Sequence, residues 1–283
     1  MQRLVSTATL PMAIGRAFFE YEGIFEAFKG LDVDGVELVF LPEWDRRWPT
    51  VTPTSADWSA APKVTPSEIA DICLSLGIAA PVVHLNRDIG TRLCSRDRED
   101  VLRGQNVLNE NLAAASKLNS EVGVLHLWDT YAKSIDIDRL FARVTEVSED
   151  YRIRLAIENI PVSAANYSVS DAWNRLSDIM PQHHGFTLDL NWCSLYDNFT
   201  ELTAHLDRVL NIHVQGAAGT APNGTPTLVP RYGHLDVLDS LAKLCEMGYD
   251  RFATLELNRP TGLSDFEAAL CMIHSTISAY FRI

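Results

Sequence analysis

Residues 185–216 read GFTLDLNWCSLYDNFTELTAHLDRVLNIHVQG, in which two short apolar runs are separated by enough chain for one crossover helix. The first run carries Asp189 at its end, and the second carries His213. Continuous apolar runs of this length are typical of parallel strands that are covered on both faces. Parallel strands end at the same edge of a sheet, so we expect Asp189 and His213 to lie close together.

The same pattern recurs along the rest of the chain. Five other apolar runs each end in a single acidic residue or histidine, and these residues are Glu37, His84, His126, Glu158 and Glu256. With the run LVSTATL at residues 4–10 there are eight candidate strands. Their spacing of roughly 25 to 46 residues leaves room for one helix each. We therefore predict the α/β class, with a single (β/α)8 TIM barrel domain over residues 1–283 rather than an open sheet.

Helix boundary signals fall between these runs. Residues 65–68 (TPSE) have the pattern of a capping box with proline at the first helical position, and the apolar segment that follows stops at Gly77. A second helix is predicted to end at Gly248, because glycine is common just beyond a helix. Ser264 is predicted to cap the last helix.

Two connections are longer than the others, and both follow C-terminal ends of strands, where barrel active sites lie. The extended loop after the second strand, residues 41–66, is rich in proline and contains Trp44, Trp48 and Trp58. The extended loop after the seventh strand, residues 216–236, is rich in glycine, proline and threonine. The three tryptophans could form an apolar lid, stack on a ligand, or pack against the barrel rim.

The composition narrows the class of partner. The net charge is −13, and we find no run of basic residues that would follow a phosphate backbone, so nucleic acid is not expected. The five cysteines are scattered without metal-binding spacing, which suggests reduced thiols in a cytoplasmic protein. No apolar stretch is long enough for a membrane span. A small-molecule substrate is expected, and self-association into a homo-oligomer stays open.

Four strand ends in the second half of the chain supply the candidate metal ligands, Glu158, Asp189, His213 and Glu256. A carboxylate at the end of an apolar strand is costly to bury unless it is paired or binds a cation. Three carboxylates and one imidazole suit a single divalent cation, and Mn, Mg, Co, Fe and Zn are all compatible with these ligands. The alternative is an ion-paired barrel mouth without a metal.

These segments also resemble a known family. The motifs IEN, TLDLN, NIHVQG and TLELN, together with GVELVF near the start, resemble the strands of the xylose isomerase-like TIM barrel superfamily. That superfamily includes sugar-phosphate isomerases, ketose epimerases, inosose dehydratases and apurinic-site endonucleases. The resemblance implies that the four ligands hold one metal, and that Glu158 and Glu256 also act as acid and base beside a carbonyl carbon. It further implies that the metal polarises substrate oxygens and stabilises an enediolate.

The resemblance also suggests substrate-binding residues. His84 and His126 occupy strands where the endonucleases carry ligands for additional zinc ions, whereas in sugar-isomerising relatives such histidines contact substrate; we favour substrate contact over a core role. Glu37 is a weaker candidate for substrate contact, because it could instead orient a histidine. Asn159 adjoins Glu158 and is expected to orient the carboxylates. His183 and His184, which precede the sixth strand, are interpreted as surface residues.

The chain departs from the family pattern at two places. Many members carry a histidine where this chain has Trp192, and many place a basic residue after the histidine that corresponds to His213. We include Trp192 as a candidate substrate contact, and Arg231 and His234 in the long loop as possible replacements for the missing basic residue.

The leading hypothesis is a metal-dependent isomerase or epimerase of a small sugar, polyol or related hydroxycarbonyl compound. The alternatives are a metal-dependent hydrolase or phosphodiesterase of the same superfamily, and a barrel that binds a ligand without catalysis. The number of bound ions distinguishes the two enzymes, since ions that reach His84 and His126 would favour hydrolysis.

Overall fold

The computed structural model describes most of the chain. The described residues are 1–14, 21–40, 64–130, 132–162, 167–215, 217–220, 226–229, 231–232, 235–257, 263 and 265–281. The three tryptophans of the loop after the second strand and His234 lie outside these residues, as does the side chain of Arg231.

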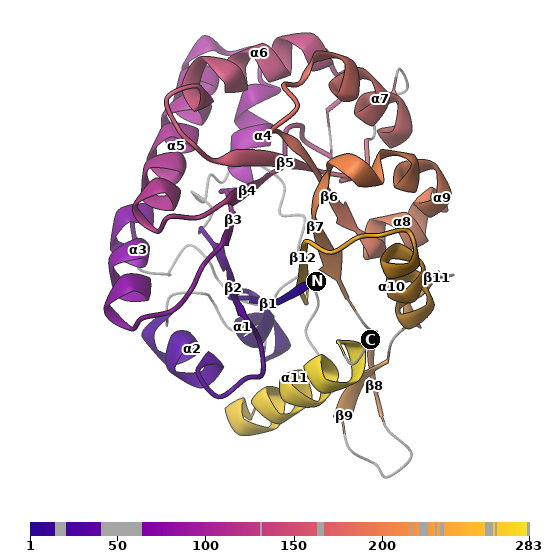
Figure 1. The fold of residues 1–283 in the computed structure, drawn as a ribbon. Coiled ribbons are helices and arrows are strands. Elements are labelled where there is room, and N and C mark those ends of the chain that lie inside the picture. The colour runs from indigo at the N-terminus through magenta and orange to yellow at the C-terminus, as the bar shows by residue number, and fades with distance from the viewer. Residues whose placement is uncertain are drawn as a thin grey trace.

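Eight parallel strands form a closed barrel, which confirms the predicted (β/α)8 fold (Figure 1). The strands are β1 (Gln2–Ser6), β2 (Gly35–Val39), β3 (Val82–His84), β4 (Val122–Leu125), β5 (Arg154–Glu158), β6 (Gly185–Asp189), β7 (Val209–Val214) and β12 (Phe252–Leu255). Around the barrel the order is β1-β12-β7-β6-β5-β4-β3-β2. Strands β5, β6, β7 and β12, which carry or directly precede the four predicted metal ligands, are therefore consecutive neighbours.

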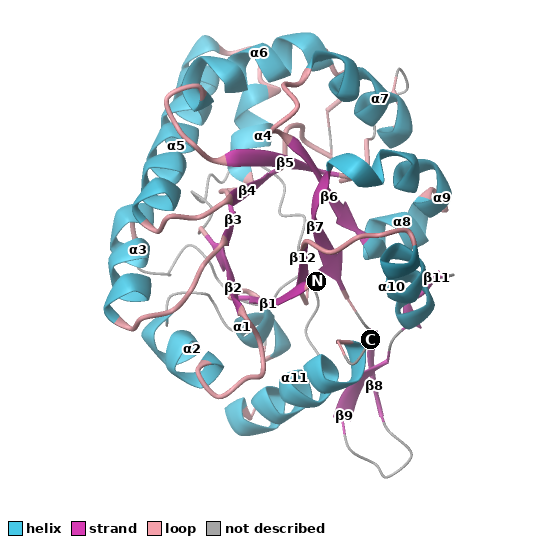
Figure 2. Ribbon diagram, in the orientation of Figure 1, coloured by secondary structure: helices cyan, strands magenta, loops and turns pink. Residues whose placement is uncertain are grey.

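Helices surround the strands on the outside (Figure 2). They are α1 (Thr9–Ala13), α2 (Tyr21–Phe28), α3 (Pro66–Ser75), α4 (Asp88–Leu93), α5 (Arg98–Lys117), α6 (Ile137–Ser148), α7 (Val169–Ile179), α8 (Leu190–Tyr196), α9 (Phe199–Leu202), the 3-10 helix η2 (Thr203–Arg208), α10 (Val237–Glu246) and α11 (Phe266–Tyr280). Among the described helices, none is long and apolar enough to cross a membrane.

The helix ends agree with the sequence signals in three of four cases. Helix α3 begins with the predicted capping box between Thr65 and Glu68. Gly77 and Gly248 follow the ends of α3 and α10 with φ of +67° and +91°, a conformation in which glycine is favoured. The predicted cap of α11 is wrong, because its N-cap is Asp265, whose carboxylate accepts from the N–H groups of the second and third helical residues.

The extended loop after β7 contains regular structure. Strands β8 (Ala217–Thr220) and β9 (Pro226–Val229) pair in antiparallel register. Strands β10 (Arg231–Tyr232) and β11 (Leu235–Asp236) form a second short antiparallel pair. Figure 1 shows β8 and β9 projecting from the barrel beside α11. The described parts of this loop are therefore short antiparallel strands outside the barrel sheet.

The barrel interior changes from apolar to polar along the strands. A small apolar cluster that includes Leu4, Val82, Val122 and Phe252 is separate from the large core between strands and helices. Further along the same strand faces the side chains are polar or ionisable, namely Ser6, His84, His126 and Thr254. The apolar cluster therefore forms a floor beneath a polar mouth, as expected for a packed barrel.

One sequence-based interpretation fails at the opposite end of the barrel. His184 is buried rather than on the surface, with 5 % of its area exposed. Its Nδ1 accepts the backbone N–H of Leu155 at 3.0 Å. The Arg208 guanidinium donates to the His184 carbonyl at 3.0 Å, which ties the segment before β6 to the end of η2. A histidine just before a strand resembles a loop residue in sequence, and only the tertiary contacts show its burial.

This environment predicts a loss of stability in acid. Burial, together with the neighbouring His183 and Arg208, lowers the pKa of His184 to about 4. The unfolded chain has the ordinary histidine pKa of about 6.5, so it takes up a proton first, and the stabilisation present above pH 6.5 is lost as the pH falls towards 4. Between pH 7 and pH 5 this linkage amounts to about 2 kcal/mol in the free energy of unfolding.

Urea unfolding at both pH values tests the prediction with His184→Asn, since an asparagine oxygen can still accept the Leu155 N–H but does not titrate. The variant should lose about 2 kcal/mol less than the wild type on acidification. His274→Asn on the exposed face of α11 is the control and should follow the wild type. An unchanged pH dependence in His184→Asn would contradict the assigned role.

Candidate metal centre

Four predicted ligands meet at the C-terminal mouth of the barrel. His213 is the central group, because its Nδ1 lies 3.1 Å from Glu256 Oε2, 3.8 Å from Glu158 Oε2 and 3.9 Å from Asp189 Oδ2. Glu158, Asp189 and His213 lie in the terminal part of their strands, and Glu256 directly follows β12. The alternation of strand side chains directs all of them into the barrel.

The tautomer of His213 suits a cation. Its Nε2 lies 3.1 Å and 3.2 Å from the two carboxylate oxygens of Glu37, so Nε2–H donates to Glu37. The Nδ1 atom is buried and has no hydrogen-bond partner in the described part of the chain. In the neutral ring a lone pair on Nδ1 would face three carboxylate oxygens. This arrangement is repulsive unless a proton on Nδ1 or a cation lies between them. Three carboxylates and one imidazole are ligands that a divalent cation accepts, so the residues fit such an ion.

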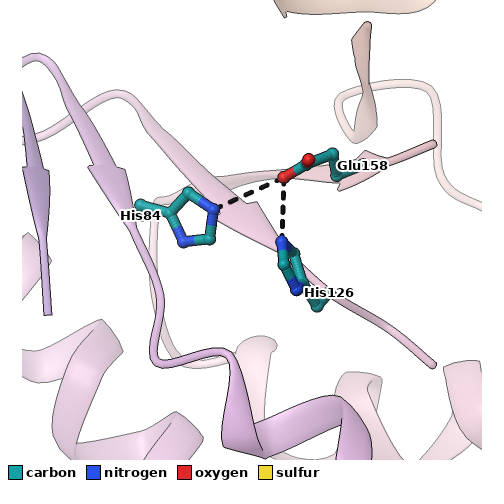
Figure 3. A group of neighbouring side chains, drawn as sticks. All are labelled: His84, His126 and Glu158. Carbon is teal, nitrogen blue, oxygen red and sulfur yellow. Dashed lines mark hydrogen bonds and ion pairs between the residues drawn. The ribbon is translucent and has the colours of Figure 1, made fainter. Parts of the chain in front are cut away.

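A second group of ionisable side chains shares Glu158 with this quartet (Figure 3). Glu158 Oε2 lies 3.0 Å from His126 Nε2 and 3.4 Å from His84 Nε2. The other ring nitrogen of His84 lies 3.0 Å from the Leu85 carbonyl, which accepts from its N–H. His126 is the most open of the three side chains, at 22 % exposure against 9 % for His84 and 4 % for Glu158. The structure thus brings both predicted histidines to the predicted metal ligands.

Asp189 is held in place by contacts to both carboxylate oxygens. One oxygen accepts the backbone N–H groups of Asn191 at 2.6 Å and Trp192 at 3.1 Å, so Asp189 is also the N-cap of α8. The other oxygen accepts from the Gln215 side-chain amide at 3.0 Å. Asn159 bonds both the N–H and the carbonyl of Asp189. These contacts fix the direction in which Asp189 faces the site.

The carboxylates and imidazoles shift one another's pKa values strongly. Burial raises the pKa of Glu158, but His126 and His213 lower it more, so the pKa lies well below its usual value. Burial raises the pKa of Asp189 well above its usual value, and the adjacent Glu158 raises it further. The Glu158 carboxylate outweighs the effect of burial on His84 and raises its pKa to about 9. In the metal-free protein, protons therefore balance the negative charge, and a bound cation would displace them.

Two further predicted site residues, Glu37 and Trp192, have different surroundings. Glu37 is completely buried, and its carboxylate bonds His213, Asn211 and Thr254. The side chain of Trp192 is partly buried and packs against the main core. The predictions for Arg231 and His234 concern a side chain and a residue that lie outside the described part of the chain.

Three polar residues at the site were not assigned a role from sequence. Asn211 and Thr254 bond Glu37 at 2.8 Å and 2.9 Å, and Gln215 bonds Asp189. Gln215 and Asn211 lie two positions from His213 on the same strand face, so alternation alone could have indicated them. Thr254 pairs with His213 across two strands, which only the register reveals.

The sequence matches the family described as a xylose isomerase-like TIM barrel over residues 25–272, which is most of the chain. The chain belongs to this family. The match begins within α2 and ends within α11, so it includes all strands that carry the candidate ligands. A search of curated proteins found no significant match to this sequence.

Several solved structures share the fold of this chain. A D-allulose 3-epimerase from Methylomonas sp. is 13 % identical, with a TM-score of 0.70, and the match covers 99 % of this chain and 96 % of that chain. A D-psicose 3-epimerase from Clostridium cellulolyticum H10, solved with D-tagatose, is 13 % identical, with a TM-score of 0.64 and coverage of 99 % and 98 %. The IolI protein, solved with a bound zinc atom, is 16 % identical, with a TM-score of 0.64 and full coverage of both chains. At these identities the similarity shows the fold.

Proposed function

We propose that this protein is a divalent-metal-dependent isomerase or epimerase of a small sugar, polyol or related hydroxycarbonyl compound. The observation that carries the proposal is the convergence of three carboxylates on Nδ1 of His213, which has no hydrogen-bond partner among the described residues. Glu158, Asp189, His213 and Glu256 would hold one cation, which would supply positive charge to oxygens of the substrate when bound.

The two glutamates are placed for proton transfer from two sides. In the barrel order, β5 and β12 are separated by β6 and β7, so Glu158 and Glu256 flank Asp189 and His213. One glutamate would remove the proton from the carbon next to the carbonyl, and the other would return a proton to the opposite face. His126, which bonds Glu158 and is partly open, would contact a substrate hydroxyl and steady the charge of Glu158.

The charges around the site support a substrate without a phosphate group. The described ion-pair partners of the three carboxylate ligands are histidines, not lysine or arginine. Phosphate recognition usually relies on arginine, lysine or a helix N-terminus with open N–H groups, and Asp189 already occupies the N-terminus of α8. The epimerases with the same fold are described with D-allulose and D-tagatose, which carry no phosphate group.

Isotope incorporation tests the proposed chemistry directly. The metal-loaded protein is incubated in D2O with a panel of ketoses, aldoses and inositol-derived ketones, and products are followed by NMR. Proton transfer through the glutamates predicts conversion with one deuterium at the carbon that changes, and loss of conversion on chelation. Failure to convert any member of the panel while a metal is bound would favour a ligand-binding barrel without catalysis.

A metal-dependent phosphodiesterase is the second candidate, and the group of His84, His126 and Glu158 favours it. These three side chains could hold a further ion that shares Glu158 with the first, and paired ions suit phosphate ester hydrolysis. Two ions per chain by elemental analysis, with hydrolysis of bis(p-nitrophenyl) phosphate and no deuterium incorporation into sugars, would support the hydrolase. One ion per chain with sugar conversion would support the isomerase.

A further inference from the structure

Glu37 lies on the opposite side of the His213 ring from the candidate metal ligands. It is the ionisable residue of β2, yet its three side-chain partners come from β7 and β12, across the barrel interior. Glu37, Asn211, His213 and Thr254 are all completely buried. Direct contact between Glu37 and a substrate at the mouth is therefore not compatible with this arrangement.

The partners of Glu37 fix the position of its carboxylate. Asn211 donates to Oε2 at 2.8 Å, and the Thr254 hydroxyl lies 2.9 Å from the same oxygen and 3.1 Å from the Asn211 side-chain oxygen. His213 Nε2 lies 3.1 Å and 3.2 Å from the two Glu37 oxygens. Carboxylate oxygens accept hydrogen bonds, so this contact places the ring proton on Nε2.

A proton on Nε2 leaves Nδ1 as the nitrogen that can bind a cation. We propose that Glu37 is a positioning residue that holds His213 as the Nε2–H tautomer and turns its Nδ1 towards Glu158, Asp189 and Glu256. The inference rests on the proposed metal-binding function. It differs from the role of substrate contact that the sequence suggested for Glu37.

If the Glu37–His213 pair had only a structural role, replacing Glu37 would have a different effect on metal affinity. If Glu37 and His213 only stabilised the barrel, replacing Glu37 would lower the stability of the metal-free protein and leave metal affinity unchanged. A carboxylate behind a ligand histidine fixes the ring and raises the basicity of the ligating nitrogen, and its loss typically lowers metal affinity by about 10-fold to 100-fold.

Two substitutions separate the effect of the Glu37 charge from the effect of its acceptor oxygen. Glu37→Gln keeps the shape and one acceptor oxygen but removes the charge, so we expect about a 10-fold weaker metal affinity. Glu37→Met removes the acceptor as well, so we expect about a 100-fold loss. Thr254→Val removes one hydrogen bond to Glu37 and should have a smaller effect in the same direction. Glu121→Gln, an exposed partner of Arg154 outside the site, is the control.

The experiment measures Zn²⁺ and Mn²⁺ dissociation constants by competition with a chromophoric chelator, together with thermal unfolding of the metal-free proteins. The nitrogen shifts of His213 in the Zn²⁺-loaded wild type should show a proton on Nε2 and zinc on Nδ1. Equal affinity of the wild type and both Glu37 variants, or zinc on Nε2, would overturn the role of Glu37 and leave the proposed function intact. Failure of the wild type to bind either ion would overturn both proposals.

Discussion

Replacing Glu158 with glutamine should lower turnover by at least about 1000-fold at saturating metal, the largest effect expected for a single substitution in this protein. Glu158 is shared by both ionisable groups at the mouth, through His213 on one side and His84 and His126 on the other. Burial raises its pKa, but His126 and His213 outweigh burial and hold the pKa well below the usual value, so Glu158 stays ionised at neutral pH. Glutamine keeps the shape but can neither accept nor return a proton.

The comparison requires initial rates for whichever sugar the wild type converts, with metal content confirmed for each sample. Glu121→Gln provides the matched control, because Glu121 is exposed and lies at the opposite end of the barrel, directly before β4. Its rate should equal that of the wild type. Retention of more than a tenth of wild-type turnover by Glu158→Gln would show that Glu158 does not transfer the proton.

Replacing Asp189 with asparagine should have opposite effects on metal binding and on metal-free stability. Asparagine is a good N-cap, so the bonds to the N–H groups of Asn191 and Trp192 can persist, and the Gln215 amide can rotate to present its oxygen. The loss of one anionic ligand should weaken metal binding by about 100-fold or more. Metal-free protein should become more stable by about 1–3 kcal/mol, because a carboxyl crowded by Glu158 is removed.

The pH dependence of this variant follows from the raised pKa of Asp189. The folded protein holds a proton on Asp189 that the unfolded chain releases above about pH 4, so this carboxyl lowers stability increasingly as the pH rises towards the folded pKa. Asp189→Asn should remove that loss. Denaturant unfolding with and without metal, from pH 5 to pH 9, provides both measurements. A metal-free variant that is less stable than the wild type across this range would contradict the electrostatic interpretation.

The fold and the ligand quartet could be predicted because both follow from local patterns. The chain contains apolar runs of strand length that each end in one ionisable residue, with room for a helix between successive runs. This pattern predicts parallel strands whose C-terminal ends meet. Glu158, Asp189 and His213 were identified in this way, and strand order alone makes their strands neighbours. The last-helix cap was missed because Ser264 and Asp265 are adjacent residues that both suit an N-cap.

The contacts behind the ligands could not be predicted, because they join residues that are far apart in sequence. Glu37 and His213 are separated by 176 positions and meet across the barrel interior. The strand pattern predicts that Glu37 and His213 both face the barrel interior. It does not predict that Glu37 lies at Nε2 of the His213 ring and the other carboxylates at Nδ1. Burial of His184 depends likewise on Leu155 and Arg208, which belong to other elements.

The most direct test of the metal centre is anomalous diffraction from crystals grown with Mn²⁺ or Zn²⁺. The structure predicts a peak about 2.0–2.3 Å from His213 Nδ1 and from carboxylate oxygens of Glu158, Asp189 and Glu256. A peak that touches only His84 and His126, or the absence of any peak at the barrel mouth in crystals of metal-saturated protein, would contradict the account.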